Sequence, residues 1–202
     1  QDLVSWTAIG ARTTESPTHR KLSSGISSAV GFKNNVDGGL MVAVNAIRSA
    51  SATNSFISVT EDGKVAMFRT GGNPHCHVIL RGGKSPNYDA ASVAACEEEL
   101  QKAGLIENIM IDCSHGNSNK DHRSQKLVLD EIALQINSGN KSIIGVMLES
   151  NLEEGNQPIP DDLSDLKYGV SITDACIDWS TTETLLREFA GSLSESLESR
   201  AV

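Results

Sequence analysis

The sequence has 202 residues, enough for one domain, and its hydrophobic content of 39% is sufficient for a packed core. Its 17 Lys and Arg residues against 26 Asp and Glu residues give a net charge of −9. This acidic balance argues against nucleic acid or an anionic membrane as the main partner, because both require a basic face. No apolar run approaches the ~20 residues of a membrane-spanning helix, and we see no secretory signal segment.

Short strand-like runs and helical stretches alternate along the chain. Apolar runs predict core strands at residues 4–11, 29–33, 77–80, 108–112 and 142–148. Apolar periodicity predicts helices at residues 40–50, 90–103, 120–137 and 181–197, the last with a capping box made by Ser180 and Glu183. The Asp62-Gly63 pair lies between two further β-like runs and predicts a β-hairpin insertion at residues 54–70.

The predicted core strands are apolar throughout rather than alternating, which is typical of strands that are buried on both faces of a parallel α/β sheet. This leaves two architectures, an open doubly wound sheet or a (β/α)8 barrel. A barrel needs eight strands and typically ~250 residues, so five strands would form an incomplete one. The four cysteines lack CxxC spacing and lie in apolar or helical stretches, which favours buried, reduced thiols and a cytoplasmic protein.

Side chains that are charged or able to bind a metal lie at or just after the end of each predicted core strand. Three of them are cations, Arg12, Lys33 and Arg81, each beside a polar loop. Because the carboxyl ends of parallel strands meet at one edge of a sheet, we expect these cations to share a site. An arginine fork and a lysine point charge suit a phosphate or a carboxylate.

The other strand ends carry residues of the metal-ligand type, His115 and Glu149, and Asp174 lies further along the chain. One imidazole and two carboxylates suit Mn, Fe, Co or Zn. Each residue also has an ordinary structural explanation: His115 as a loop-capping imidazole, Glu149 as a surface acid and Asp174 as a helix N-cap. The GxxxxGK[ST], GxGxxG and GxSxG patterns are absent, so the sequence indicates no P-loop, dinucleotide site or nucleophile elbow.

Six segments together resemble one known family, in order and in register: residues 10–16, 30–34, 79–83, 110–118, 149–157 and 171–176. They are similar to class I 3-deoxy-D-arabino-heptulosonate 7-phosphate (DAHP) synthases, and residues 112–121 look most like fungal members. The resemblance implies a (β/α)8 TIM barrel, of which residues 1–202 would be a single partial catalytic domain from the C-terminal portion. Three motifs expected before this portion do not occur in the chain: a metal-ligating cysteine, a further substrate-binding arginine and a Lys-Pro-Arg-Thr segment.

The resemblance also implies roles for individual residues. Phosphoenolpyruvate would bind to Arg12, Lys33 and Arg81, assisted by the backbone of Ala11. A divalent metal, with Mn, Fe or Co favoured and Zn as an option, would bind to His115, Glu149 and Asp174. Lys33 and His115 are then the candidate catalytic residues. Ser27, Phe56 and Phe68 would lie near the site of an aromatic amino acid inhibitor.

The activity implied is condensation of phosphoenolpyruvate with D-erythrose 4-phosphate, the first step of the shikimate pathway to aromatic amino acids, in an enzyme that is a homo-oligomer when intact. A second hypothesis is that this chain by itself is a non-catalytic partial domain, which retains part of the phosphoenolpyruvate and inhibitor surfaces. An open arc of five strands would leave two unpaired edges and exposed apolar faces. We therefore expect the isolated chain to be marginally stable and inactive.

Overall fold

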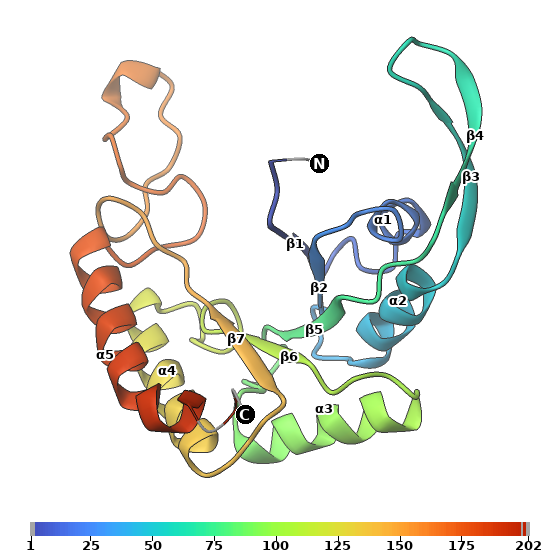
Figure 1. The fold of residues 1–202 in the computed structure, drawn as a ribbon. Coiled ribbons are helices and arrows are strands. Elements are labelled where there is room, and N and C mark those ends of the chain that lie inside the picture. Colours follow the sequence, from blue (N-terminus) through green and yellow to red (C-terminus); the bar gives the residue numbers. More distant parts are fainter. Residues whose placement is uncertain (1–2, 199, 201–202) are drawn as a thin grey trace.

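The computed structural model describes residues 3–198 and residue 200, and its centre is a five-stranded parallel sheet (Figure 1). The strand order is β1-β2-β5-β6-β7, formed by Trp6–Ile9, Ala29–Lys33, Cys76–Leu80, Ile109–Asp112 and Ile143–Met147. Among the described residues, β1 and β7 each pair with a neighbour strand on one side only. The sheet is curled, so these strands form an incomplete (β/α) barrel, as predicted.

Helices connect the strands and lie on the outer side of the curled sheet (Figure 1). In chain order they are α1 to α5, formed by Pro17–Ser23, Met41–Ser51, Ala90–Lys102, Gln125–Asn137 and Trp179–Glu198. Two short 3-10 helices, η1 at His122–Ser124 and η2 at Leu163–Asp165, lie in the loops after β6 and β7. None of the described helices is both long and apolar enough to cross a membrane.

The predicted hairpin forms a separate two-stranded antiparallel sheet. Its strands are β3, Asn54–Val59, and β4, Val65–Thr70, and they project away from the barrel sheet (Figure 1). Gly63 occupies the turn with a φ of 76°, a conformation that glycine adopts without steric cost. The Asp-Gly signal therefore located the turn correctly.

The alternation of side chains along each strand separates the core from the barrel interior. Val30 and Phe32 of β2 and Val78 and Leu80 of β5 are fully buried in the core cluster that the helices cover. The alternate residues of β2 end with Lys33, whose ammonium group reaches a carboxylate at the end of β6. The inner face thus becomes polar at the carboxyl ends of the strands, where the predicted site residues lie.

Four details of the predicted elements were wrong. The pattern missed α1, although Pro17 after Ser16 is a helix-start signal. The first strand has four residues instead of eight, and the helix after β6 begins at Gln125 because residues 122–124 form a 3-10 turn. At α5 the cap is Asp178 rather than Ser180: the Asp178 carboxylate accepts a 2.7 Å bond from the Thr181 N–H.

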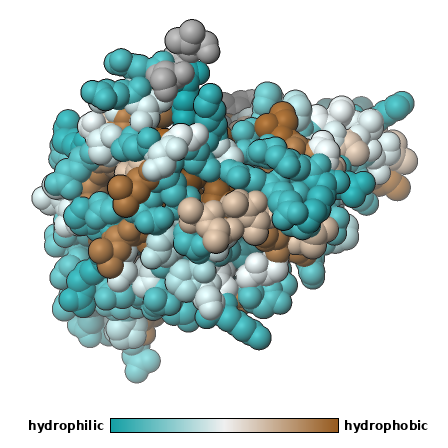
Figure 2. Space-filling view, turned by 90° about the horizontal axis from the view of Figure 1, so that it is seen from below, coloured by the Kyte–Doolittle hydropathy of each residue, from teal (hydrophilic) through white to brown (hydrophobic). Residues whose placement is uncertain are grey.

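Several large apolar side chains remain on the surface among the described residues. Ile144 on the edge strand β7 is 48% exposed, and Leu127 and Leu134 of α4 are exposed as well. Seen from below, the surface is mainly hydrophilic with apolar groups between the polar ones (Figure 2). The side chain of Ile144 projects from a face of the sheet, and none of the described elements buries it there.

Glycines allow the loops after β5 and β6 to pack backbone against backbone. Gly82 has a φ of 75°, and a Cβ atom there would lie 2.5 Å from the carbonyl carbon of Gly116. The Gly116 N–H donates a 3.0 Å hydrogen bond to the Arg81 carbonyl. This close approach fixes the Arg81 loop against the loop that carries His115.

We predict that Gly82→Ala destabilises the protein by about 2–5 kcal/mol, the sum of left-handed backbone strain and steric overlap. Gly104→Ala is the matched control, because Gly104 has a φ of 68° but nothing within 4 Å of its added Cβ. The control should lose only ~1–2 kcal/mol from strain. Urea unfolding of both variants measures the difference, and equal losses would contradict the packing argument.

Candidate functional site

The predicted anion-binding residues line one pocket at the carboxyl ends of the strands. The pocket has a volume of about 350 Å³, and its lining includes Ala11, Arg12, Lys33, Arg81, His115 and Asp174. These residues come from the ends of four strands and from the loop after β7. The structure therefore brings all three cations beside two of the three predicted metal ligands.

Buried polar side chains hold the cation-bearing strand ends in place. Thr14, which is fully buried, donates a 2.9 Å hydrogen bond to the Lys33 carbonyl. Asn34, also fully buried, accepts a 2.8 Å bond from the Arg81 N–H and donates a 3.0 Å bond to the Gly82 carbonyl. The backbone that carries the cations is thus fixed before any ligand arrives, which favours binding of an anion within a protein of net charge −9.

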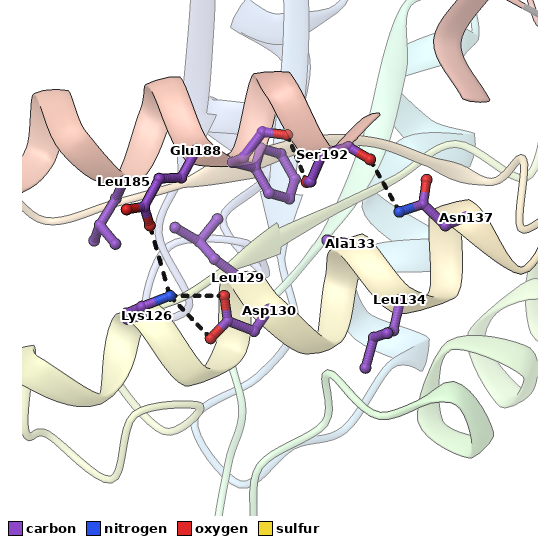
Figure 3. Close-up of a pocket in the computed structure, with 10 residues that line it drawn as sticks. Lys126, Leu129, Asp130, Ala133, Leu134, Asn137, Leu185, Glu188 and Ser192 are labelled. Carbon is purple, nitrogen blue, oxygen red and sulfur yellow. Dashed lines mark hydrogen bonds and ion pairs between the residues drawn. The ribbon is translucent and has the colours of Figure 1, made fainter. Parts of the chain in front are cut away.

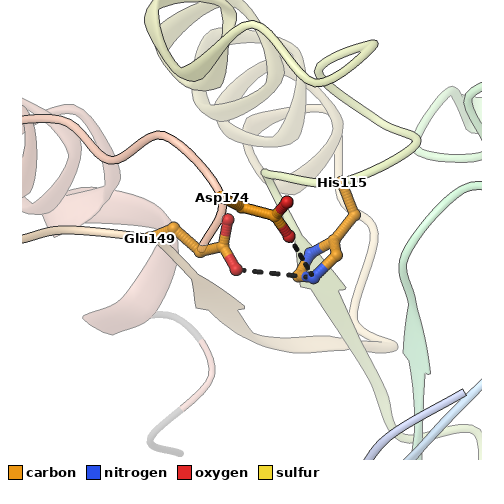
Figure 4. A group of neighbouring side chains, drawn as sticks. All are labelled: His115, Glu149 and Asp174. Carbon is orange, nitrogen blue, oxygen red and sulfur yellow. Dashed lines mark ion pairs between the residues drawn. The ribbon is translucent and has the colours of Figure 1, made fainter. Parts of the chain in front are cut away.

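His115, Glu149 and Asp174 form the second part of the site and point toward one another from three segments (Figure 4). His115 Nε2 lies 3.4 Å from Glu149 Oε1 and 3.9 Å from Asp174 Oδ2, and all the ligand atoms lie within 4.8 Å of one another. Ligand atoms that share one ion at bond lengths of about 2.1 Å lie about 3.0–3.4 Å apart. The three groups fit a divalent cation after a small contraction.

Asp112 lies behind His115 and links the two halves of the site. Its carboxylate is fully buried, with Oδ2 at 2.9 Å from His115 Nδ1 and at 2.7 Å from Lys33 Nζ. Burial raises the pKa of Asp112, but the contacts with His115 and Lys33 outweigh it and hold the pKa below its usual value. The 2.9 Å contact does not have hydrogen-bond geometry at Nδ1, so Asp112 acts on His115 through its negative charge. This charge favours the proton on Nδ1 and the lone pair on Nε2, which faces the pocket.

The backbone of His115 adopts the left-handed region with a φ of 52°. This conformation costs about 1–2 kcal/mol for a residue with a side chain, and such strain concentrates at functional sites. The following turn is held by Asn117, which is buried and donates bonds of 2.8 Å and 3.1 Å to the carbonyls of Asp112 and Leu80. The turn aims the imidazole at the two carboxylates.

The predicted inhibitor residues are only partly brought together. Phe56 and Phe68 stack across the hairpin with ring centroids 6.1 Å apart. Phe56 also lines a cavity of about 420 Å³ between the hairpin and α1, together with Thr18, Lys21, Leu22, Ile57 and Ser58. Ser27 is exposed in the loop between α1 and β2 and does not line this cavity.

A third hollow lies between α4 and α5 and differs from the strand-end pocket in its lining (Figure 3). It has a volume of about 350 Å³ and an apolar floor that includes Leu129 and Leu185. Its lysine, Lys126, already pairs with Asp130 at 3.0 Å and with Glu188 at 3.8 Å. One lysine faces two carboxylates at this groove, which leaves it slightly acidic, unlike the cationic strand-end pocket.

The cysteines take no part in the His115 cluster. All four are free, and burial raises the pKa of Cys76 to about 11 and that of Cys96 to about 12. These two side chains therefore remain thiols near neutral pH, as expected for packing residues.

Sequence reasoning assigned no role to several residues that support the site, among them Asp112, Ser114 and Gln125. Asp112 and Ser114 lie three residues and one residue before His115, so their position in the motif was the available signal. Gln125 gave no local signal, because its partner lies 24 residues away on the next strand end.

Comparison with known proteins identifies the family. The model of the DAHP synthetase I family matches residues 1–187. The chain therefore belongs to this family, and the resemblance predicted from its motifs is confirmed.

Relatives and a solved structure agree with this assignment. A Tyr-sensitive phospho-2-dehydro-3-deoxyheptonate aldolase from Salmonella typhimurium is 56% identical over 199 residues, which is 98% of this chain and 56% of the relative. A putative aldolase of the same name from Schizosaccharomyces pombe is 52% identical over 194 residues, 95% of this chain and 53% of the relative, so a fungal protein is among the relatives.

A solved phospho-2-dehydro-3-deoxyheptonate aldolase from Francisella tularensis superposes with a TM-score of 0.90 at 47% identity, over 96% of this chain and 56% of that one. This chain thus spans about half the length of the relatives it matches.

We predict that Asp112→Asn destabilises the metal-free protein by about 3 kcal/mol, because it leaves the largely buried Lys33 ammonium without its counter-charge. Asp130→Asn is the control: its pair with Lys126 is about half exposed on both sides, and its loss should cost under ~0.5 kcal/mol. Urea unfolding at neutral pH in the presence of a chelator measures both. Equal small effects would show that the Lys33–Asp112 pair does not stabilise the strand ends.

Proposed function

We propose that the complete polypeptide carrying this chain is a DAHP synthase. It would condense phosphoenolpyruvate with D-erythrose 4-phosphate and water to give 3-deoxy-D-arabino-heptulosonate 7-phosphate and phosphate. The single observation that carries this proposal is the strand-end pocket, where Arg12, Lys33 and Arg81 converge beside His115 and Asp174. Family membership supports the same reaction.

Electrostatic repulsion is the main physical obstacle to this reaction. Phosphoenolpyruvate carries a carboxylate and a phosphate, and the aldehyde carries a second phosphate. Cations fixed in advance reduce the cost of bringing these anions together and orient the enol carbon toward the aldehyde. Arg12 and Arg81 offer bidentate forks, and Lys33 supplies a point charge anchored by Asp112.

His115, Glu149 and Asp174 would hold a divalent cation, of which Mn, Fe and Co suit the mixed donors and Zn is an option; bound there, it would supply Lewis-acid polarisation of the aldehyde oxygen. The Asp112 carboxylate at Nδ1 keeps the His115 lone pair directed at this position. Lys33 and His115 are accordingly the proposed catalytic residues, since both line the pocket.

Other parts of the proposal concern regulation and assembly. The relatives' names include Tyr-sensitive and Phe-sensitive forms. The stacked aromatic pair of Phe56 and Phe68 supports an aromatic amino acid as inhibitor. Ser27, in the loop that follows α1, is the third residue proposed for this site. A homo-oligomeric intact enzyme and a cytoplasmic location stay predictions.

The alternative, a non-catalytic partial domain, has its own supporting observation. Within the described residues β1 and β7 have unpaired edges, and the chain spans about half the length of its relatives. The isolated chain would then keep half of the anion pocket without turning over substrates.

The decisive experiment measures phosphate release from phosphoenolpyruvate and D-erythrose 4-phosphate with Mn²⁺ present. We expect the complete polypeptide to release phosphate and to lose this activity on chelation or after Glu149→Ala, whereas the isolated 202-residue chain stays inactive. Inactivity of the folded complete polypeptide would refute the proposed function. Activity of the isolated chain would refute the partial-domain alternative.

Arg81→Ala should lower kcat/KM of the complete polypeptide, because a charge-assisted contact to the substrate is lost. The expected loss of transition-state stabilisation is about 2–4 kcal/mol. Arg187→Ala on the outer face of α5 is the control, because that side chain is 77% exposed and pairs with Glu183. Steady-state kinetics should show no change for the control. An unchanged kcat/KM for Arg81→Ala would remove this residue from the site.

A further inference from the structure

Glu149 lies beyond the regular part of the sheet, yet its backbone is fully engaged. Strand β7 ends at Met147, whose carbonyl accepts the last hydrogen bond from the loop after β6, donated by the Cys113 N–H at 2.9 Å. Two residues later, none of the described strands pairs with Glu149 on the β6 side. Its backbone N–H and C=O still require partners, because they are partly shielded from water.

Gln125 supplies these partners from the first turn of α4. Its Oε1 accepts a 2.8 Å hydrogen bond from the Glu149 N–H, and its Nε2 donates a 3.0 Å bond to the Glu149 carbonyl. The same carbonyl also accepts a 3.1 Å bond from the Ile177 N–H. The side-chain amide of Gln125 thus replaces the pair of backbone hydrogen bonds that a neighbouring strand would give Glu149.

The burial of Gln125 shows that this contact is specific. The residue is fully buried, and a buried amide is costly unless its donor and its acceptor both find partners. Gln125 directs both groups to the one residue Glu149. A side chain needed only to fill space would be apolar at this position.

Ser114 completes the arrangement at the other end of Glu149. Its Oγ donates a 2.6 Å hydrogen bond to Glu149 Oε2, which leaves Oε1 facing His115 Nε2 at 3.4 Å. Gln125 therefore fixes the main chain of Glu149, and Ser114 fixes the rotation of its carboxylate. Together, the two constraints direct Glu149 Oε1 toward His115 Nε2.

We propose that Gln125 is a positioning residue of the divalent-cation site, acting through the backbone of Glu149, with Ser114 orienting the carboxylate. This inference rests on the proposed function of His115, Glu149 and Asp174 as ligands. Supporting groups of this kind typically change metal affinity by ~10–100-fold when removed. The effect must pass through the Glu149 side chain, since Gln125 contacts that residue rather than the ion.

The test uses the complete polypeptide and measures the Mn²⁺ dissociation constant from the electron paramagnetic resonance of free Mn²⁺. Gln125→Met and Ser114→Ala should each weaken binding by ~10–100-fold. Gln125→Asn, which keeps an amide but is one methylene too short to reach both groups, should weaken it as well. This second variant decides the matter if Gln125→Met does not fold.

Gln135→Met is the matched control. Gln135 lies on the same helix, is nearly buried and donates a 2.8 Å bond to the Tyr88 carbonyl, away from the cluster. It should lower the thermal midpoint as Gln125→Met does, but leave the Mn²⁺ dissociation constant unchanged. A purely structural role for Gln125 would make the two variants alike in both measurements and would overturn the proposal.

A double-mutant comparison separates this inference from the proposed function. In a Glu149→Ala background, Gln125→Met should cause no further loss of Mn²⁺ affinity, because the group it positions is gone. An equal loss with and without Glu149 overturns the positioning role. Normal Mn²⁺ affinity in Gln125→Met, together with lost binding in Glu149→Ala, also overturns the positioning role. That result leaves the proposed metal site intact. If the unsubstituted protein binds no Mn²⁺, both proposals fall.

Discussion

Asp112 lies fully buried at the end of β6, and its carboxylate meets Lys33 on one side and His115 on the other. Lys33 belongs to the cation group, and His115 to the group of potential metal ligands. A single buried charge therefore couples the two halves of the site and sets the direction of both side chains. Without it, Lys33 would be an uncompensated cation and His115 Nδ1 would lose its neighbouring negative charge.

The sheet makes this arrangement possible because its strands are parallel. Lys33, Arg81 and Asp112 come from strands or strand ends that all point the same way, so side chains far apart in sequence meet at one rim. The glycines at 82 and 116 let two of the loops touch through their backbones, and buried Asn34 joins two strand ends. In the described residues the same curled sheet has open edges at β1 and β7. These edges bear on the stability of the isolated chain, whereas the geometry of the site depends on the strand ends.

Support for the site comes from groups that carry no charge as well as from those that do. Gln125 and Ser114 bind Glu149 at its backbone and at its carboxylate, while Asn117 fixes the turn that holds His115. Each of these residues is buried and satisfies its polar atoms on the strand-end loops. A ligand-binding rim built in this way loses little entropy when it is occupied, which is the advantage of preorganisation.

The sequence by itself determined the parallel sheet, the hairpin turn at Asp62-Gly63 and the identity of the cations and potential ligands, because these depend on local apolar patterns and on motifs. It did not determine the short helix α1, the Asp178 cap or the roles of Asp112 and Gln125. Helix α1 and the Asp178 cap are local features that the apolar pattern did not reveal. The roles of Asp112 and Gln125 depend on contacts between residues distant in the chain, Lys33 with Asp112 and Gln125 with Glu149. Only the tertiary structure decides such contacts, since burial and strand register select which polar groups meet.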